Sequence, residues 1–477
     1  VRTGWLTIIF SILIVISGFV MFNSPKSLQR QLPVEVSLGA ESSWTVSKGV
    51  AFSGAKNFLI GSGLGSFAVD FSKFRTVNFN YDNLAWSLRF FQPYNTYFAV
   101  LSEGGVLTVL ALLFVLFIVL GYVFHAWFYR GLVLKKMSSE NFSKKHNNIQ
   151  YLELFAVAAA WLVLWVGMIF GFYGAANWYL WILLLAMTIS AMSLLKYKVV
   201  KNKKWTLEDI PQYNLAFSFG LIVVIAIVVM AGVMGVRFYW ADVVYAKALS
   251  AKDLKTAEMH LQNSVNLRGG YDIYQAALAK VNLNQASEEM KQKNPDVQKA
   301  SALVAKAVNK ARVASQLSPN SVAIWENLAV MYENASLLVP QAGEWAIKSL
   351  DRAVELEPTN AYLFWRLGNN YMLAKNYSKA SDNYKKATEL KNDYLGAYLG
   401  LARAYEFDKD INKSVESYKE SLRLGGSRNA EVLFNYGRLL YNRNKGDDRS
   451  NAEQLWKASV GLQPKYSNAL YSLGLLY

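Results

Sequence analysis

Apolar and polar residues change their pattern along the chain near Arg237. Before it, long apolar stretches alternate with lysine-rich loops, and after it an amphipathic helical pattern repeats to the last residue. Five apolar segments reach the roughly 18–25 residues that a membrane-spanning helix needs. They are Trp5–Phe22, Tyr97–Phe124, Leu152–Phe172, Asn177–Leu195 and Leu215–Phe238. All five are predicted to be helical, because lipid cannot satisfy the polar groups of an open backbone.

Basic loops set the expected orientation of these spans. Residues 130–148 and 196–213 are rich in lysine, and such loops face the cytoplasm. Counting through the spans then places the loop Asn23–Thr96 and everything after Phe238 on the extracytoplasmic side. Tryptophans and tyrosines near the segment ends fit the interfacial belts of a membrane protein.

A repeat of 34 residues is clear from Ala361 onward. Large and small residues recur in the same order in two consecutive units, as Phe364, Leu367, Gly368, Tyr371, Ala380, Tyr384 and Ala387, and then as Tyr398, Leu401, Ala402, Tyr405, Ser414, Tyr418 and Ser421. Small residues stand where two helices approach closely, and large ones where each first helix packs. This spacing resembles the tetratricopeptide repeat, a helical hairpin that stacks into a solenoid.

Looser units flank the two clear repeats. Helical hairpins are predicted at Ala241–Leu267 and Tyr271–Pro319, and a half-unit ends the sequence at Tyr477, beyond which the array is expected to continue. The predicted fold is therefore all-α, with a transmembrane region at 1–238, degenerate repeats at 239–320 and tetratricopeptide repeats at 321–477. We expect the solenoid to bind a protein or peptide partner, although most of its aromatic residues serve as inter-helix core.

Composition removes several classes of function. The net charge of +16 is concentrated in loops beside apolar segments, and no basic stripe interleaved with aromatics follows, which argues against nucleic acid as a partner. The absence of cysteine excludes disulfides, thiolate catalysis and cysteine–metal sites. No metal site and no cofactor are expected.

The extracytoplasmic loop holds the candidate chemistry. Ser42–Asn57 has helical spacing, and the alternating glycines Gly61, Gly63 and Gly65 predict a tight turn with close backbone packing. They form neither a P-loop nor a dinucleotide motif, because no Gly-Lys-Ser/Thr and no strand–helix context follow.

Two charged residues lie at the outer mouth of the second span. Arg89 has the planar guanidinium that grips phosphate or diphosphate in two places, and Glu103 is a carboxylate inside a span, where it usually faces the bundle or a water-filled cavity. The alternatives are an interfacial or locally paired arginine, and a helix-start carboxylate that the helix dipole favours.

The segments Gly61–Phe67, Trp86–Arg89 and Tyr94–Tyr97, followed by Glu103, together resemble the signature region of the O-antigen ligase and polymerase family of membrane glycosyltransferases. The resemblance covers roughly residues 40–125. It implies transfer of a glycan from a polyprenyl-diphosphate carrier to an acceptor in the prokaryotic cytoplasmic membrane, with lipid as a further partner. Such cores are also found fused to tetratricopeptide repeats.

That resemblance implies roles for particular residues. Arg89 would hold the carrier diphosphate, with Arg75, Lys48 and Lys56 as weaker contributors beside the glycine turn. The remaining candidates would form the acceptor site, with Glu103 orienting Tyr94 and Asn95. This chain departs from the family in having Tyr94 where the family has a histidine, and tyrosine, with a pKa of about 10, is a poor base near neutral pH. It also has five expected spans where the family has about a dozen.

Two other functions remain open from the sequence. A non-catalytic scaffold, in which the membrane half anchors the solenoid to assemble an envelope complex, is favoured by the missing histidine. A transporter or channel is less favoured, because the spans contain few ionisable residues and no evident inverted repeat.

Overall fold

The computed structural model describes residues 37–81, 85–136, 141–194 and 211–477, and its regular elements in these ranges are all helices. The all-α prediction is confirmed for this part of the chain. The first expected span, Trp5–Phe22, lies outside the described residues.

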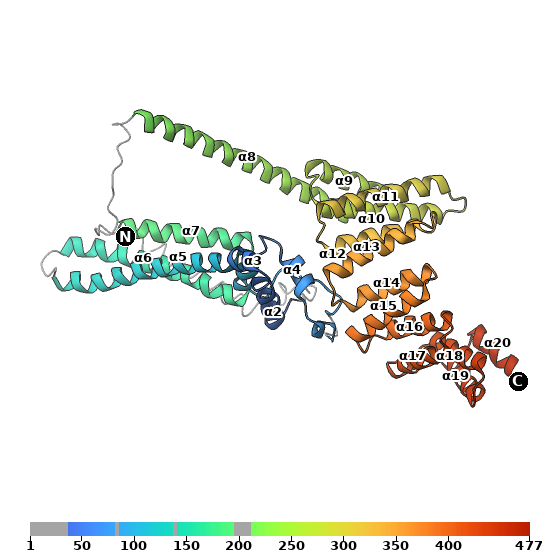
Figure 1. Ribbon diagram of the computed structural model, residues 1–477. Coiled ribbons are helices and arrows are strands. Elements are labelled where there is room, and N and C mark those ends of the chain that lie inside the picture. Colours follow the sequence, from blue (N-terminus) through green and yellow to red (C-terminus); the bar gives the residue numbers. More distant parts are fainter. Residues whose placement is uncertain (1–36, 82–84, 137–140, 195–210) are drawn as a thin grey trace.

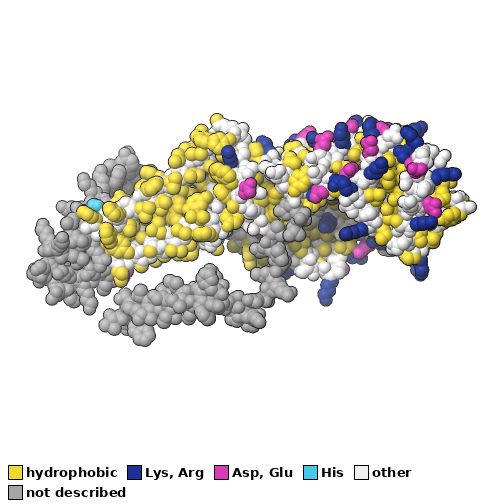
Figure 2. Space-filling view, turned by 90° about the horizontal axis from the view of Figure 1, so that it is seen from below, with side chains coloured by type: hydrophobic (Ala, Val, Ile, Leu, Met, Phe, Trp, Pro, Cys, Tyr) yellow, Lys and Arg dark blue, Asp and Glu magenta, His cyan; other side chains and the backbone are white. Residues whose placement is uncertain are grey.

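Three apolar helices form a bundle at one end of the molecule (Figure 1). They are α5 (Thr96–Lys136), α6 (Asn141–Phe170) and α7 (Ala175–Leu194). A tryptophan cluster joins α6 and α7, since the ring of Trp161 lies 5.7 Å from that of Trp165 and 5.3 Å from that of Trp181, and Val119 of α5 packs in the same cluster. By length and composition, four described helical segments are able to cross a membrane: Thr96–Phe128, Tyr151–Phe170, Ala175–Met192 and Phe217–Leu249. Figure 2 shows hydrophobic side chains over the bundle and charged ones over the opposite end of the molecule.

The helix α8 (Pro211–Leu249) belongs to both halves of the chain. Its apolar part exposes its side chains, while Ala248 near its end is buried against Leu261 and Leu278 of the first repeats. The domain division expected at 238 therefore falls inside one continuous helix. The hairpin predicted at Ala241–Leu267 is present, with the end of α8 as its first arm.

The loop before α5 folds into short helices that lie between the bundle and the solenoid (Figure 1). These are α2 (Ala40–Ala51), α3 (Ala55–Ile60), α4 (Phe67–Phe74) and the 3₁₀-helix η1 (Val77–Tyr81). The single helix expected over Ser42–Asn57 is wrong in its extent, because the chain breaks at Gly54 between α2 and α3. Phe71, Phe79 and Phe90 give this loop its own core, with ring centroids 5.3–6.0 Å apart.

Antiparallel helix pairs make up the remainder of the chain. In order they are α9 (Leu254–Leu267), α10 (Asp272–Met290), α11 (Val297–Leu317), α12 (Val322–Ala335), α13 (Ala342–Leu356), α14 (Ala361–Leu373), α15 (Tyr377–Leu390), α16 (Leu395–Phe407), α17 (Ile411–Arg423), the 3₁₀-helix η3 (Gly426–Arg428), α18 (Ala430–Arg443), α19 (Asp448–Leu462) and α20 (Ser467–Leu476). The elongated hairpin predicted at Tyr271–Pro319 corresponds to α10 and α11.

The repeat positions act as the 34-residue pattern predicts. Tyr384 is buried between Gly368 and Gly400, where an added Cβ would lie 2.7 Å and 2.4 Å from its ring. Side-chain caps begin several of the helices, because an Asp or Asn oxygen accepts a free backbone N–H of the first turn. Asn376 and Asp410 do this at equivalent places in consecutive repeats. Small residues therefore set the helix spacing, and caps set where the helices begin.

Candidate functional site

Two arginines of the loop meet carboxylates of the solenoid. Arg75 follows α4 and is buried, and its Nη1 donates to Oε1 of Glu357 at 2.9 Å. Its Nη2 donates to the side chain of Asn80 at 2.8 Å and to the carbonyl of Trp86 at 2.9 Å. Neither carboxylate nor guanidinium of the Arg75–Glu357 pair has any solvent exposure. A buried ion pair of this kind is tolerated only when further hydrogen bonds satisfy both groups.

Arg89 uses all three guanidinium nitrogens on the same surface. Its Nε and Nη2 lie 2.7 Å and 2.6 Å from Oε2 of Glu357, and its Nη1 lies 2.5 Å from Oε2 of Glu326. Arg366 pairs with Glu333 at 2.8 Å and lies 3.6 Å from Glu326. The connected network therefore contains three arginines (75, 89 and 366) and three glutamates (326, 333 and 357), and its formal charge is zero.

Both loop arginines remain charged. Burial lowers the pKa of Arg75, and attraction to Glu357 opposes that effect. Burial also acts to lower the pKa of Arg89, but attraction to Glu357 and Glu326 outweighs it, so that this pKa is raised. Arginine is effectively always protonated in proteins, so both guanidinium groups act as cations in this network.

Main-chain contacts extend the same interface to the next repeat. The side chain of Asn80 donates to the carbonyls of Thr359 at 2.8 Å and Leu390 at 3.1 Å. In the other direction, the Thr359 hydroxyl donates to the carbonyl of Arg75 at 3.0 Å, and Lys391 Nζ donates to the carbonyl of Asn80 at 2.7 Å. The solenoid thus binds both the side chains and the backbone of the loop.

Equivalent positions in two consecutive repeats form this surface. Glu357 and Lys391 each follow the second helix of a hairpin, one ending α13 and the other ending α15. Glu357 is acidic and takes the arginines, whereas Lys391 is basic and lies 5.1 Å from the ring centroid of Trp86. Trp86 in turn meets Tyr394 edge to face at 5.2 Å. The 34-residue repeat thus places Glu357 and Lys391 at equivalent positions, and their opposite charges let them contact different groups of the loop.

The glycine turn packs against a break in α5. Gly61, Gly63 and Gly65 all have positive φ, which confirms the tight turn predicted from the sequence. Gly105 inside α5 also has a φ of 68°, and the helix kinks there. At this kink the N–H of Gly63 donates to the carbonyl of Glu103 at 3.0 Å. This hydrogen bond therefore fastens the glycine turn to α5 at its kink.

The Glu103 side chain faces the start of α4. Its Oε1 accepts the backbone N–H of Phe67 at 3.3 Å, so the carboxylate caps a helix of the loop. Asp70, one turn further along α4, accepts hydrogen bonds from Ser62 and Ser66, yet burial dominates and raises its pKa. Glu103 therefore has a structural role as a cap of α4. This resembles the helix-start alternative, except that the helix start it faces is that of α4 and not that of its own helix, α5.

The other candidates lie apart from the arginines. Asn95 caps α5 by accepting the N–H of Phe98 at 3.0 Å, and it donates to the carbonyl of Ile169 at 3.2 Å. Tyr94 is 40% exposed. Lys48 on α2 and Lys56 on α3 are exposed, whereas Arg75 is buried, so these three candidates do not form one site.

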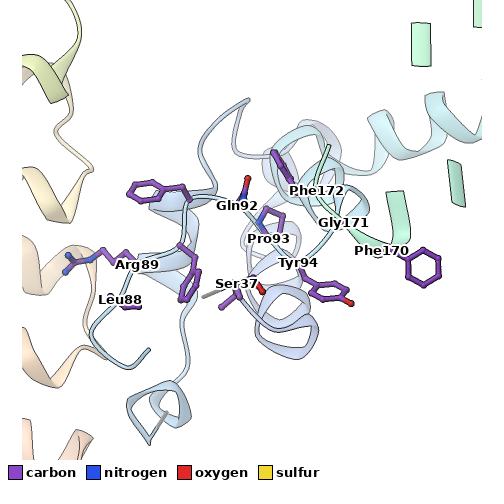
Figure 3. A pocket seen from close by; sticks show the side chains of 12 residues that line it. Ser37, Leu88, Arg89, Gln92, Pro93, Tyr94, Phe170, Gly171 and Phe172 are labelled. Atoms are coloured by element: carbon purple, nitrogen blue, oxygen red, sulfur yellow. The ribbon is translucent and has the colours of Figure 1, made fainter. Parts of the chain in front are cut away.

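A cavity of about 700 Å³ opens where the loop meets the turn between α6 and α7. It is lined by residues 37, 38, 88–94 and 170–172. Figure 3 shows the guanidinium of Arg89 directed away from this cavity, toward the solenoid, while Tyr94 lies on another side. The structure therefore places both Arg89 and Tyr94 at one cavity, with the Arg89 guanidinium turned away from it. Among the described residues, no cluster of His, Cys, Asp or Glu is suited to a metal ion.

Sequence reasoning missed the glutamates that pair with Arg89. Glu357 was visible as a carboxylate at the carboxyl end of a helix, where the dipole disfavours it, and that position signals a cationic partner. Which cation it would meet was not readable, because Arg75 and Arg89 lie more than 260 residues earlier in the chain.

Comparisons with known proteins match only parts of this chain. No family model matches it. The BBSome complex member BBS4 of Xenopus tropicalis is 29% identical over 143 residues, which is 30% of this chain and 26% of that protein. The type IV pilus assembly protein PilF of Pseudomonas aeruginosa is 31% identical over 121 residues, or 25% of this chain and 46% of that protein. The chain thus spans less than half the length of either relative.

Solved structures are similar at a low level. A structure of Pseudomonas aeruginosa PilF covers 50% of this chain at 18% identity and a TM-score of 0.37, and PilW, described as a type IV pilus biogenesis factor, covers 50% at 14% identity and the same score. The relatives described here are not O-antigen ligases, so that resemblance stays an expectation from the loop residues. The 34-residue spacing and the stacked hairpins identify the second half of the chain as a tetratricopeptide-type solenoid.

Proposed function

We propose that this protein is a membrane-anchored tetratricopeptide scaffold of the cell envelope, which holds a protein or peptide partner on its solenoid. The observation that carries the proposal is the use of Arg75 and Arg89. The two residues best suited to bind an anionic substrate are instead paired with Glu357 and Glu326, and they fasten the solenoid to the loop.

Membrane anchoring and sidedness are part of this proposal. The four apolar helices supply the anchor, and the basic loops assign the cytoplasmic side. The loop Asn23–Thr96 and the chain after Phe238 were each expected outside the cytoplasm on independent counts of spans. Contact between Arg89 and Glu357 requires that both be on one side, which supports that topology.

The partner would bind along the first helices of the repeats. Salt bridges link consecutive first helices there, from Arg403 of α16 to Glu431 of α18 and from Arg438 to Glu406. Leu373 and Phe407, at the ends of α14 and α16, are 77% and 57% exposed. Exposed apolar and aromatic residues beside paired charges suit an extended protein segment better than a small ligand. Among the proteins similar to this chain, BBS4 is a BBSome complex member and PilF is a type IV pilus assembly protein.

Site-specific crosslinking tests the scaffold. A photoreactive residue is placed at Leu373 or Phe407, with exposed Lys386 on α15 as the matched control, in full-length protein in its own membrane. We expect the same partner to be crosslinked from Leu373 and Phe407 and not from Lys386. Equal crosslinking from all three positions, or none, would contradict the proposal.

A glycan transferase is the second candidate, and the cavity of about 700 Å³ favours it. In this role Arg89 would hold a diphosphate, and Tyr94 and Asn95 would border the acceptor. An anion beside Arg89 would, however, stand close to the carboxylates of Glu326 and Glu357. Glycan transfer is therefore measured in Arg89→Ala and Tyr94→Phe. The transferase predicts loss of transfer in Arg89→Ala, and the scaffold predicts no change in either variant.

A further inference from the structure

The contact between loop and solenoid joins two bodies that each have their own core. The loop packs around Phe71, Phe79 and Phe90, and the solenoid around residues such as Leu350 and Leu363. Polar groups dominate what lies between them, with ion pairs and backbone hydrogen bonds from Arg75, Asn80 and Arg89. An interface of this kind resembles one between separate domains, where relative motion is the default expectation.

The helix α8 does not hold the two bodies against one another, because its residues 217–237 are exposed within the described structure. Its far end is anchored in the first repeats by Ala248 and Leu261. Without Arg89, the buried Arg75–Glu357 pair and the hydrogen bonds of Asn80 still attach the loop to the solenoid, so Arg89 is expected to fix the orientation of the arm and not its attachment.

The geometry at Arg89 is that of a binding site for a guanidinium group. Glu357 receives two of its nitrogens and Glu326 receives the third, so the planar fork is fully paired. Glu357 has no solvent exposure and Glu326 has 14%, which shields both carboxylates from water and salt. A lysine in this place would offer one point charge and would not match the two carboxylates.

We propose that Glu326 and Glu357 form a guanidinium-binding site on the solenoid, that Arg89 fills it from the loop, and that this occupancy holds the solenoid arm in one orientation relative to the bundle. Glu326 lies on α12, which is also a first helix, but the occupant of the site is a residue of this chain and does not depend on the partner proposed for α14 and α16. The site therefore stands whether or not that partner exists.

Chemical rescue tests the site. The chain contains no cysteine, so spin labels can be placed specifically at Lys73→Cys on α4 and Lys385→Cys on α15, both exposed. Distances between the labels are measured in full-length protein in lipid nanodiscs. We expect one narrow distance in the parent protein, and a broad distribution in Arg89→Ala. Millimolar guanidinium chloride should restore the narrow distance to Arg89→Ala, and equimolar sodium chloride should not.

Matched variants separate this site from general effects. Adding Glu326→Gln, which spares the Arg75–Glu357 pair, to Arg89→Ala should abolish the rescue. Arg403→Ala, which removes an exposed ion pair elsewhere on the solenoid, should leave the distance narrow. Retention of the narrow distance in Arg89→Ala would overturn the proposal, as would equal rescue by sodium chloride. Should Arg89→Ala lose helicity by circular dichroism, Arg89→Lys replaces it, and a distance as narrow as in the parent protein refutes the site.

Discussion

The glycine turn offers the sharpest quantitative prediction. At Gly61 the backbone has a φ of 71° and a ψ of −173°, a region that essentially only glycine occupies. An added Cβ would also lie 2.3 Å from the carbonyl carbon and oxygen of Glu103. Gly61→Ala therefore combines backbone strain of about 1–3 kcal/mol with overpacking of about 1–3 kcal/mol.

Two neighbouring glycines separate these contributions. Gly63 has a φ of 117° with open space around a Cβ, so Gly63→Ala tests strain alone. Gly54 has an extended φ of 165° and open space, so Gly54→Ala should be nearly neutral. The expected order of destabilisation is Gly61→Ala, then Gly63→Ala, then Gly54→Ala.

Hydrogen exchange gives a local readout of this series. The N–H of Ser62 donates to the carbonyl of Ser102 at 2.9 Å and holds the turn against α5. A combined loss of about 2–6 kcal/mol should speed its exchange by roughly 30-fold or more, because each 1.4 kcal/mol is a factor of ten. Exchange in Gly61→Ala as slow as in Gly54→Ala would show that the turn does not lock the kink at Gly105.

Three further changes are expected to have measurable effects. Glu357→Gln leaves the buried Arg75 without its carboxylate, so docking of the loop should weaken by about 3–5 kcal/mol; proteolysis of the loop measures this, and Glu431→Gln, which removes an exposed pair, should have little effect. Gly400→Ala forces a Cβ to 2.4 Å from the Tyr384 ring and should cost about 1–3 kcal/mol in urea unfolding, whereas Gly461→Ala, with open space, should not destabilise. Hydrogen bonding from Arg443 lowers the pKa of Asp448. The stability that the Asp448 carboxylate contributes is therefore complete above its ordinary pKa of 3.8 and is lost as pH falls through the lower folded pKa. The urea midpoint of Asp448→Asn should lie below that of the parent protein at pH 7, and the difference should shrink in strong acid.

Local pattern was enough to predict the helices and the repeats. The 34-residue spacing identified Tyr384 and its small neighbours, because close helix packing needs glycine or alanine at fixed positions. Apolar length alone located α5, α6 and α7. The extent of α2 was misjudged, since Gly54 interrupts the helical spacing without a change in hydrophobicity.

Long-range pairing was beyond the sequence. Arg89 was expected to bind a diphosphate, with a local ion pair as the alternative, and nothing local distinguishes a phosphate from a glutamate as its anion. In the folded protein the anions that pair with Arg89 are Glu326 and Glu357, because the stacked repeats place them beside the loop. The proposed roles of Tyr94 and Asn95 at an acceptor site stay predictions, and Asn95 has a structural task as the cap of α5.

The continuity of α8 makes its helical phase a structural constraint. Its 39 residues rise about 58 Å as one rod from the apolar stretch into the first repeat. Adding a single residue between Phe217 and Ala241 would rotate everything beyond it by about 100° and raise it by about 1.5 Å. The first repeats, which α8 enters at Ala248, would then leave the apolar stretch at a different angle, although no contact within the solenoid had been altered. The length of this helix, more than the identity of its exposed side chains, thus sets the direction in which the first repeats leave the apolar stretch.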